Sequence, residues 1–596
     1  MRVLFITLAD PDNFGVRCLA SYLISYHHEA HIVQLKSCTY NRTVNLPEDP
    51  LLLAYGNGSL VHIKFPRVSP TENELLAKKL HEYNPDVVGI SIRGVLETLF
   101  PPLAALVRKA CSRVFLCVGG IGPTLTPAFY LEHGADAAVR GEGEEPLLDL
   151  VAALEKKQNW KNIKNICYIK NKRVIKNPVR PREKNLSRFP LPLDDPSFFS
   201  YIENDVYAPV PMNTTDISQS SPYALKTYRC ITSRGCLGAC SYCSAGSVYK
   251  LYNKYNKCTP KMSMRTEDHV FNELNRAKTD GYRIIQFDDD FFVRPVHELL
   301  SFLERYKKEI DLPYHAFFHP KQLLTHQFLI DIIIDSGNVN FTFGIQHASK
   351  VFCEKIYKRK AFSNAYLKLY EAITERGGNV GFQFIGGNPL EREQDFEANL
   401  HFIKQFPHDV THKTALSIGC FYLMFFPGVE LIEMFPNIIN LPRTTKDWLY
   451  RSLLLDIRRL TYDNNFECIR NDPQYYSDLE KLQKLRHFLV RERHYAYVHD
   501  FIKTLRGKRV YFWGDSEIYE KKKHLFSDLE PIGMLIDIPK KEIDKIDKIP
   551  VKYSDEVLLA QEQHPIIILG KEQNVIFRKI LKKNSLYKNI FSCAML

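Results

Sequence analysis

The sequence has little that would hold it in a membrane or export it from a cell. No apolar run reaches the ~18 uninterrupted residues that a transmembrane helix needs. The opening residues, MRVLFITLADPDNFG, lack the basic segment and small-residue cleavage site of a secretory signal, and their pattern predicts a first strand instead. The 14 cysteines are not spaced as a disulfide framework, which is typical of proteins from a reducing compartment. We therefore expect a cytoplasmic protein.

Positive charge is not concentrated in a recognisable nucleic-acid module. The net charge of +12 is spread along 596 residues, and the lysine runs come late, within 521–523 and 579–583. Scattered lysines are most often a solvated face, so we do not expect nucleic acid as a partner. The length suits about three or four domains, and an apolar content of 45% suits well-packed cores.

Residues 1–150 alternate short apolar runs with helical patterns, which is typical of a doubly wound parallel sheet. The predicted strands are Val3–Leu8, His31–Leu35, Asp86–Ile92, Val114–Val118 and Ala137–Arg140, with a helix at Gly15–Ser25. Ligands of such sheets bind outside the carboxyl ends of the strands. The loops predicted to lie there are 9–15, 91–94, 119–127 and 141–145.

The densest chemical signal lies in residues 228–246, YRCITSRGCLGACSYCSAG. Cys236, Cys240 and Cys243 stand in a C-x3-C-x2-C arrangement, and their thiolates can converge on one soft metal centre. A [4Fe–4S] cluster that is held by only three cysteines keeps one iron open for another ligand. A structural zinc site, completed by the nearby Cys230 and Cys258, is the alternative.

With an aromatic residue directly before its third cysteine, this loop resembles the cluster loop of radical S-adenosylmethionine (SAM) enzymes, in which the open iron binds SAM. Strand-then-helix units occupy residues 228–428, with predicted strands at Arg229–Ser233, Arg283–Phe287, Pro313–Phe318, Asn340–Ile345, Val380–Ile385 and Leu416–Phe421. The resemblance implies that these units form a partial (β/α)6 barrel, with functional groups at the carboxyl ends of its strands.

Several predicted strand ends match SAM-binding positions of that family. The second strand ends in three aspartates, which suit the SAM ammonium group, although the last, Asp290, is as readily a helix cap. The fourth strand ends where relatives often carry Glu, and the fifth ends in a glycine turn that allows close approach of the adenine. The resemblance implies SAM contacts from Tyr242, Asp288, Asp289, Gln346, Gly386, Gly387, Asn388 and Pro389.

The loops of the first region resemble those of the cobalamin-binding domain that precedes many radical SAM domains. The matching segments are DNFGVRCLASYL, VVGISIR, VGGIGPTLTP and VRGEGEEPLLDL. They imply cobalamin contacts from Asn13, Gly15, Ser91, Gly119, Gly120, Thr124, Gly141, Glu142 and Gly143. Asp12 stands where many relatives place the histidine that ligates cobalt, so we expect no protein nitrogen below the metal. A flavodoxin-like packing module without a cofactor is the alternative.

The other regions carry weaker signals. Residues 151–227 contain repeated prolines and resemble the linker between the two domains of the family, and residues 429–500 have an amphipathic helical pattern. Residues 501–596 resemble a small Rossmann-like domain with Asp537 near the ribose position. There, Gly514 is followed by Asp515 rather than by the rest of a G-x-G-x-x-G fingerprint. We therefore favour a structural or partner-docking role for this last region.

The chain as a whole resembles the cobalamin-dependent radical SAM enzymes. The resemblance implies a methyltransferase that acts on an unactivated carbon of a small-molecule, natural-product or peptide substrate, through a 5′-deoxyadenosyl radical and methylcobalamin. It further implies a [4Fe–4S] cluster, SAM and cobalamin as cofactors, and a flavodoxin or ferredoxin as electron donor. A radical cyclase or rearrangement enzyme, and a non-catalytic cobalamin-responsive Fe–S protein, are the alternatives.

No catalytic residue beyond the cluster ligands is predicted. His315, His319 and His347 lie near the ends of the third and fourth strands. A lone histidine is more often a packed or hydrogen-bonded group than a ligand or base, so we expect structural roles for all three.

Overall fold

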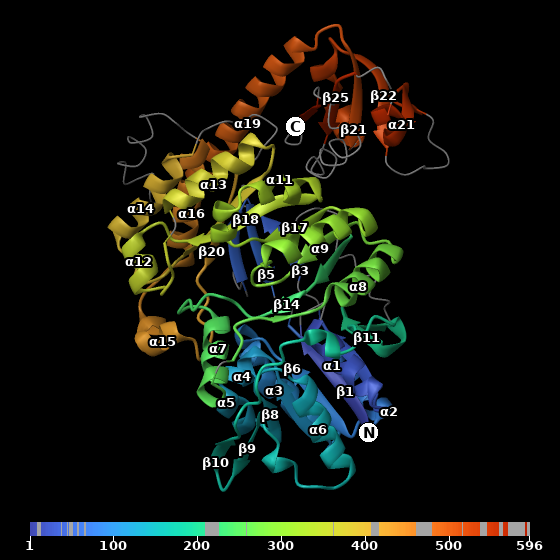
Figure 1. Ribbon diagram of the computed structural model, residues 1–596, viewed down its shortest axis with the longest axis vertical. Helices are drawn as coiled ribbons and strands as arrows, with labels where there is room; N and C mark the ends of the chain where they lie inside the picture. Colours follow the sequence, from blue (N-terminus) through green and yellow to red (C-terminus); the bar gives the residue numbers. More distant parts are fainter. Residues whose placement is uncertain are drawn as a thin grey trace.

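The computed structural model is elongated, with its three large sheets following one another from the N-terminal to the C-terminal end (Figure 1). It describes residues 1–8, 14–36, 39–43, 46, 52–56, 59–64, 67–208, 226–257, 259–361, 363–406, 416–460, 479–514, 516–536, 545–559, 564–569 and 590–592. None of the described helices is both long enough and apolar enough to cross a membrane. The predicted α/β class is confirmed.

The first sheet has nine strands and a parallel centre. In spatial order the parallel strands are β8 (Ala137–Val139), β7 (Phe115–Gly119), β6 (Val87–Ser91), β1 (Arg2–Leu8) and β2 (Glu29–Leu35). Helices α1 (Phe14–Ser25) and α6 (Glu144–Glu155) pack on one face, and α2 (Pro70–Tyr83) and α3 (Phe100–Ala110) on the other. Because these strands are buried on both faces, they read as continuous apolar runs, and the doubly wound arrangement predicted from them is confirmed.

Strands from residues 151–227 extend this sheet at both edges. A hairpin of β9 (Ile166–Lys170) and β10 (Arg173–Lys176) pairs with β8 through β9. At the opposite edge β11 (Phe199–Glu203) pairs with β2, and β12 (Val206–Ala208) pairs with β11. The predicted linker thus also contains strands, because a proline-free stretch follows Pro196 in which Phe199–Glu203 form a mostly buried strand.

The proline-rich part of the linker is clamped to both neighbouring bodies. The Asp194 carboxylate forms ion pairs with Arg17 of α1 and with Arg276 of α8 (Glu267–Thr279), a helix that packs against the second sheet. Arg17 also donates from Nε to the Leu193 carbonyl at 2.8 Å. One carboxylate in the linker thus holds a cation from each body.

The second sheet contains the predicted six parallel strands in an open arrangement. They are β13 (Thr227–Cys230), β16 (Ile284–Phe287), β17 (Tyr314–Phe317), β18 (Asn338–Gln346), β19 (Val380–Gly386) and β20 (Leu416–Tyr422). The first strand is shorter than predicted: Ser233 and Arg234 form β14, which pairs with β15 (Ser263–Met264) in a separate two-stranded sheet. The chain leaves the large sheet there because Thr232 and Ser233 turn to hydrogen-bond Asp289.

A hairpin that the sequence analysis did not predict extends the second sheet from the N-terminal region. The hairpin consists of β4 (Leu52–Gly56) and β5 (Ser59–Lys64), and β3 (Thr39–Thr43) pairs antiparallel with β5 on its other side. β4 pairs antiparallel with β20, with Tyr55 opposite Cys420. An unpaired edge strand invites association with other chains, and this hairpin covers the edge that β20 would otherwise expose. The first and second bodies are therefore joined by strand pairing as well as by the linker.

A buried ionic cluster fastens this hairpin to the helices beyond the sheet. Tyr55 donates its hydroxyl proton to Asp456 Oδ2 at 2.7 Å, and Arg486 Nε donates to the same oxygen at 2.6 Å. Arg459 bonds the other oxygen at 2.8 Å. Asp456 lies on α16 (Thr445–Leu460) and Arg486 on α19 (Leu479–Thr504), which leads to the C-terminal body. Burial alone would raise the pKa of Asp456, but Arg459 and Arg486 lower it to about 2.

The third sheet has the strand order of a Rossmann-like domain. Its parallel strands in space are β24 (Ile549–Tyr553), β22 (Glu530–Ile536), β21 (Arg509–Gly514), β25 (Ile566–Leu569) and β26 (Ile590–Ser592). Gly514 has φ +121, and a Cβ there would lie 2.0 Å from the Leu569 carbonyl oxygen. This glycine is thus required by packing against the neighbouring strand; Asp515 and Asp537 lie outside the described residues.

We predict that Asp456→Ala destabilises the protein much more than Asp447→Ala on the same helix. Removing the Asp456 carboxylate leaves the buried Arg486 without its partner, which costs about 3–5 kcal/mol. Asp447 is an exposed residue paired with Arg451, and its loss should cost about 1 kcal/mol or less. Urea unfolding of both variants measures the difference; equal midpoints would contradict a stabilising role for the buried cluster.

Candidate active site

The candidate site lies where the first sheet meets the second. The segments that follow β7 and β8 contact helix α7 (Ser244–Tyr255), which begins directly after the cysteine loop. Figure 1 shows α7 beside α4 (Ile121–Leu125), which follows β7. The predicted cobalamin loops and the cysteine loop are thus brought to one boundary.

The three cysteines lie half-buried around a glycine in this loop. A Cβ on Gly238 would lie 3.5 Å from Cys236 Sγ and 3.6 Å from Cys240 Sγ, so these sulfurs flank the same residue. Cys243 precedes the first residue of α7. Three thiols in one loop are a soft donor set that suits a [4Fe–4S] cluster with one open iron. Cys258, which the zinc alternative would need, lies outside the described residues.

The protein environment does not ionise the outer thiols on its own. Burial raises the pKa of Cys236 to about 12, and the negative charges of Asp290 and the other cysteines add to the effect. Burial likewise raises the pKa of Cys243. Because metals bind thiolates, a group bound here has to displace these protons.

The backbone before the first cysteine is fixed by contacts that require glycine. Gly235 has φ +103, and a Cβ there would lie 2.2 Å from the Lys261 carbonyl oxygen and 2.6 Å from Arg182 Nη1. Arg182 itself donates to that carbonyl at 2.9 Å. On the preceding residue, Arg234 Nη2 donates to Glu144 Oε1 at 2.6 Å. Glu144 is the first residue of α6, so this ion pair joins the cysteine loop to the first body.

Of the aspartates at the end of β16, only the last has a carboxylate that faces solvent without a partner. Asp288 bonds Arg229 and Gln286, and the buried Asp289 accepts from Thr232 and Ser233. Asp290 has no hydrogen bond or ion pair with any described residue and does not cap a helix, since α9 begins at 296 after Pro295. It is exposed yet ringed by protein, and this desolvation, with the charge of Asp289, raises its pKa to about 6.

The other predicted SAM residues lie at neighbouring strand ends. Tyr242 packs edge-on against Tyr357 at 4.8 Å and belongs to the same apolar cluster as Ile385 of β19. Gln346 ends β18 with φ +67, and its amide folds back over Gly344. Strain of this kind gathers at functional sites.

The turn after β19 is fixed by packing. Gly387 has φ +72, and a Cβ there would lie 2.5 Å from the Tyr422 ring. A Cβ on Gly386 would lie 3.0 Å from Trp448. The Asn388 side chain accepts from the Leu390 amide at 3.0 Å, and Pro389 lies between them. The glycines that the family resemblance assigned to SAM therefore also have a structural requirement in this chain.

The three histidines near strand ends have the structural surroundings that the sequence analysis favoured. His315 hydrogen-bonds Thr342 at 2.8 Å, and burial lowers its pKa to about 4. His347 stacks on Phe352 and bonds Glu391 at 3.0 Å. His319 precedes α10 (Pro320–Thr325) and accepts from the backbone amide two residues on.

Two of the predicted cobalamin loops are tied together by Thr124. Its hydroxyl donates to the Gly120 carbonyl at 2.7 Å and accepts from the Gly141 amide at 3.0 Å. Gly120 has φ +102, and a Cβ there would lie 2.6 Å from the Ile92 carbonyl oxygen. Ser91 and Gly119 end the adjacent strands β6 and β7. The loops after β6, β7 and β8 are thus held together at one edge of the sheet.

The remaining cobalamin positions differ in their surroundings. The Glu142 amide donates to the Tyr252 hydroxyl of α7 at 2.7 Å, and a Cβ on Gly141 would lie 2.3 Å from that oxygen. Glu142 also pairs with Arg182 at 3.6 Å, and Gly143 packs on Leu19. This loop is therefore a contact between the two bodies. Gly15 is exposed in the first turn of α1, while Asp12 and Asn13 lie outside the described residues.

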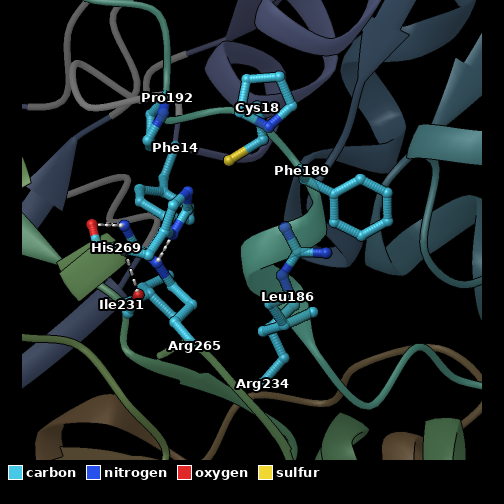
Figure 2. A pocket seen from close by; sticks show the side chains of 10 residues that line it. Phe14, Cys18, Leu186, Phe189, Pro192, Ile231, Arg234, Arg265 and His269 are labelled. Carbon is cyan, nitrogen blue, oxygen red and sulfur yellow. Dashed lines mark hydrogen bonds between the residues drawn. The ribbon is translucent and has the colours of Figure 1, made fainter. Parts of the chain in front are cut away.

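A small cavity behind the cysteine loop shows how tightly the bodies meet. Figure 2 shows Arg265 bonded to the Ile231 carbonyl and to His269, both at 2.9 Å, on one side of it. Its volume is about 20 Å³, which suits about one water molecule. It is lined by Phe14, Cys18, Leu186, Phe189, Pro190, Pro192, Ile231, Arg234, Arg265 and His269. This is a packing gap between α1, the linker and the second body, and it has no room for a substrate.

Two family models match the chain. The B12 binding domain matches residues 57–151, and the Radical SAM superfamily matches residues 230–403. The first match spans β5 to most of α6, and the second runs from the end of β13 into α14 (Glu393–Lys404). Their order confirms the predicted order of a cobalamin-binding and a radical SAM domain, and with it the predicted cofactors: cobalamin, SAM and a [4Fe–4S] cluster.

Two curated proteins are similar to this chain over most of their length. An uncharacterized methyltransferase of Pyrococcus horikoshii is 25% identical over 377 residues, which cover 63% of this chain and 74% of that protein. The hopanoid C-3 methylase of Methylococcus capsulatus is 22% identical over 476 residues, 78% of this chain and 81% of that one.

Solved structures share the fold. The radical SAM methyltransferase TsrM from Kitasatospora setae, solved with cobalamin and a [4Fe–4S] cluster, has a TM-score of 0.51 at 14% identity, and the match covers 73% of this chain and 78% of that one. The cobalamin-dependent SAM radical enzyme OxsB, solved with aqua-cobalamin, has a TM-score of 0.51 at 14% identity over 85% and 75%. At these identities the likeness shows the fold alone.

We predict that Gly235→Ala abolishes most cluster incorporation, whereas Gly281→Ala does not. Both glycines have positive φ, so both variants carry a backbone strain of about 1–2 kcal/mol. Only the Gly235 variant also has to displace the Lys261 carbonyl, since a Cβ on Gly281 meets nothing within 4 Å. Iron and acid-labile sulfide assays after anaerobic reconstitution measure the outcome. Equal incorporation would show that the loop does not depend on this close packing.

Proposed function

We propose that this chain, which carries a B12-binding domain followed by a radical SAM domain, methylates an unactivated carbon of its substrate. The observation that supports the proposal best is the convergence of the two predicted cofactor sites on one boundary. The Arg234–Glu144 ion pair links the cysteine loop to the first residue of α6, which directly follows Gly143 of the predicted cobalamin set. A reaction that needs both cofactors on one substrate requires this adjacency.

The residues at the boundary have the chemistry to hold the predicted cofactors. Cys236, Cys240 and Cys243 supply thiolates for a [4Fe–4S] cluster. Asp290, whose carboxylate has no hydrogen-bond or ion-pair partner among the described residues, supplies an acceptor for the SAM ammonium group. We assign it this role in place of Asp288 and Asp289, because the carboxylates of those two residues already accept hydrogen bonds from protein side chains. Tyr242, Gln346 and the 386–389 turn would border the rest of SAM.

Among its described residues, the first body offers cobalamin mainly backbone groups at the ends of the strands. Gly119 and Gly120 lie there, the buried Thr124 hydroxyl fixes Gly120 against Gly141, and glycines allow close approach of a large ring. Ser91, Asn13, Gly15, Gly141, Glu142 and Gly143 complete the proposed set. Bound at these sites, SAM and the cluster would supply a 5′-deoxyadenosyl radical and cobalamin would carry the methyl group.

The protein's own contribution is positioning. Asp289 fixes Thr232 and Ser233, Gly235 sets the turn, and Arg234 sets the register against Glu144, so the cysteine loop has one arrangement relative to the first sheet. No described side chain at the boundary is assigned as an acid or base, in agreement with a reaction in which the cofactors carry the chemistry.

The names of the two similar curated proteins, a methyltransferase and a hopanoid C-3 methylase, favour methyl transfer over a cyclase or rearrangement reaction. A TsrM structure with tryptophan as substrate favours a small-molecule substrate. We place the enzyme in the cytoplasm, where thiols stay reduced, since none of its ten described cysteines forms a disulfide, and propose a flavodoxin or ferredoxin as electron donor.

We predict that Asp290→Asn weakens SAM binding more than Asp288→Asn does. Loss of a charge-assisted hydrogen bond costs about 1.5–3 kcal/mol, so affinity should fall about 10- to 100-fold. Asp288 serves as the matched control because Arg229 and Gln286 already use its carboxylate. Equilibrium dialysis of SAM with the reconstituted proteins measures both affinities. A larger loss of SAM affinity in the Asp288 variant would indicate that Asp288, rather than Asp290, contacts the ammonium group.

We predict that the reconstituted protein, given SAM, hydroxocobalamin, reductant and its substrate, forms S-adenosylhomocysteine and 5′-deoxyadenosine in about equal amounts. One SAM is consumed to methylate cobalamin and another to form the radical. A Cys236/Cys240/Cys243→Ala variant should form no 5′-deoxyadenosine, and a deuterium label at the attacked carbon should appear in this product with the wild type. 5′-Deoxyadenosine without a methylated product would favour a cyclase or rearrangement enzyme, and neither product a non-catalytic Fe–S protein.

A further inference from the structure

A cation that the sequence motifs do not single out contacts the cysteine loop from the side of the second sheet. Arg359, in the segment after α12 (Lys350–Lys355), donates from Nη1 to Cys240 Sγ at 3.6 Å. Its neighbours in sequence are also cationic, but Lys358 turns away to pair with Glu430. Over the described residues, no other side-chain cation donates to Cys236, Cys240 or Cys243.

The guanidinium of Arg359 is held in place before any cofactor binds. Nη2 donates to the Gly344 carbonyl at 2.5 Å, and Tyr366 donates its hydroxyl proton to the same carbonyl at 3.2 Å. The Arg359 amide donates to the Cys353 carbonyl at 2.9 Å. An arginine fixed through its backbone and its second nitrogen keeps its remaining donor directed at the sulfur.

The same segment is fastened to the cysteine loop at a second point. Ser241, next to Cys240, donates from its amide to the Tyr357 carbonyl at 3.0 Å and from its hydroxyl to the Ile356 carbonyl at 2.6 Å. The distance between the guanidinium and the sulfur is therefore fixed by contacts on both sides. A long, exposed arginine would pair with sulfur only part of the time; this one is half-buried and pinned.

We propose that Arg359 is a positioning residue that raises the reduction potential of the [4Fe–4S] cluster held by the three cysteines, an inference that rests on the proposed function. Reduction adds one electron to a cluster that already carries net negative charge. A fixed cation that hydrogen-bonds a ligating sulfur stabilises the reduced form more than the oxidised form, and hydrogen bonds to the sulfurs are among the determinants of cluster potential.

One-electron reduction of the cluster needs no further redox group in the protein. An external low-potential donor of the flavodoxin or ferredoxin class loses one electron and the cluster gains it, while Arg359 keeps its proton throughout because its guanidinium is always charged. Burial would lower the pKa of Arg359, but Tyr242, Tyr366 and Cys240 raise it. In the test, dithionite takes the place of the protein donor.

The test is a potentiometric titration of reconstituted full-length protein, followed by the EPR signal of the reduced cluster. We expect Arg359→Gln to reduce at a lower potential, with the ratio of reduced to oxidised cluster at a fixed poise falling about tenfold, or about 59 mV for one electron. Arg359→Lys keeps the charge, so its cluster should have a reduction potential between those of Arg359→Gln and the wild type. Lys358→Gln removes the same charge one residue away, where it faces Glu430, and should titrate as the wild type.

The iron and sulfide content distinguishes a failure of the proposed function from a failure of the proposal for Arg359. If the wild type takes up no iron and sulfide, the proposed function fails. If the wild type and all variants take up a cluster but Arg359→Gln has the same reduction potential as Lys358→Gln and the wild type, the proposal for Arg359 fails while the proposed function stands. A shift that appears only when SAM is present, together with weaker SAM binding by Arg359→Gln, would also overturn it, because Arg359 would then act on SAM rather than on the cluster.

Discussion

The relation between the first two bodies depends on the ion pair between Arg234 and Glu144. The Glu144 side chain is almost fully buried, and taking a carboxylate and a guanidinium out of water is costly unless they meet in good geometry. Here the two groups meet at 2.6 Å. Burial would raise the pKa of Glu144, but the charge and hydrogen bond of Arg234 lower it. A pair buried in this way accepts only one register of the two bodies, because any shift leaves an uncompensated charge.

Other contacts between the two bodies can form only in this register. The Tyr252 hydroxyl reaches the Glu142 amide only while α7 lies against the loop that precedes α6. The Asp194 carboxylate, at the far side of the seam, holds Arg17 and Arg276 together. Beside the Arg234 side chain the described residues leave a gap of only about 20 Å³ between the bodies, so packing at this point is tight. Two cofactors bound on either side would therefore keep a constant separation without help from the substrate.

The parts of this arrangement that could be predicted from the sequence are those in which local pattern and tertiary structure agree. Strands such as β1 and β7 are buried on both faces and read as apolar runs, and the cysteine spacing is a local signal. Strands β3, β4 and β5 were missed because Leu52–Gly56 pairs with a strand near residue 420, and no local pattern records such a partner. The difference between Asp289 and Asp290 was hidden for the same reason. Adjacent identical residues are distinguished only by the Thr232 and Ser233 donors that the fold brings to one of them.

Arg359 illustrates a further limit of sequence motifs. It lies 119 residues from Cys240 in a lysine-rich segment, and neither its spacing nor its neighbours mark it as a site residue. Its role depends on Gly344, in a strand that the sequence predicts for other reasons, and on Ile356, at the end of α12. Charge alone does not separate it from Lys358.

The hairpin that completes the second sheet has a consequence for synthesis on the ribosome. Tyr55 and Asp456, which hydrogen-bond each other in the finished protein, are 401 residues apart in the chain. At a translation rate of about 5–20 residues per second, the hairpin has left the ribosome about 20–80 s before its partner helix exists. During that interval β4 exposes an open strand edge, and a nascent chain in this state is a natural client for a chaperone that shields strand edges.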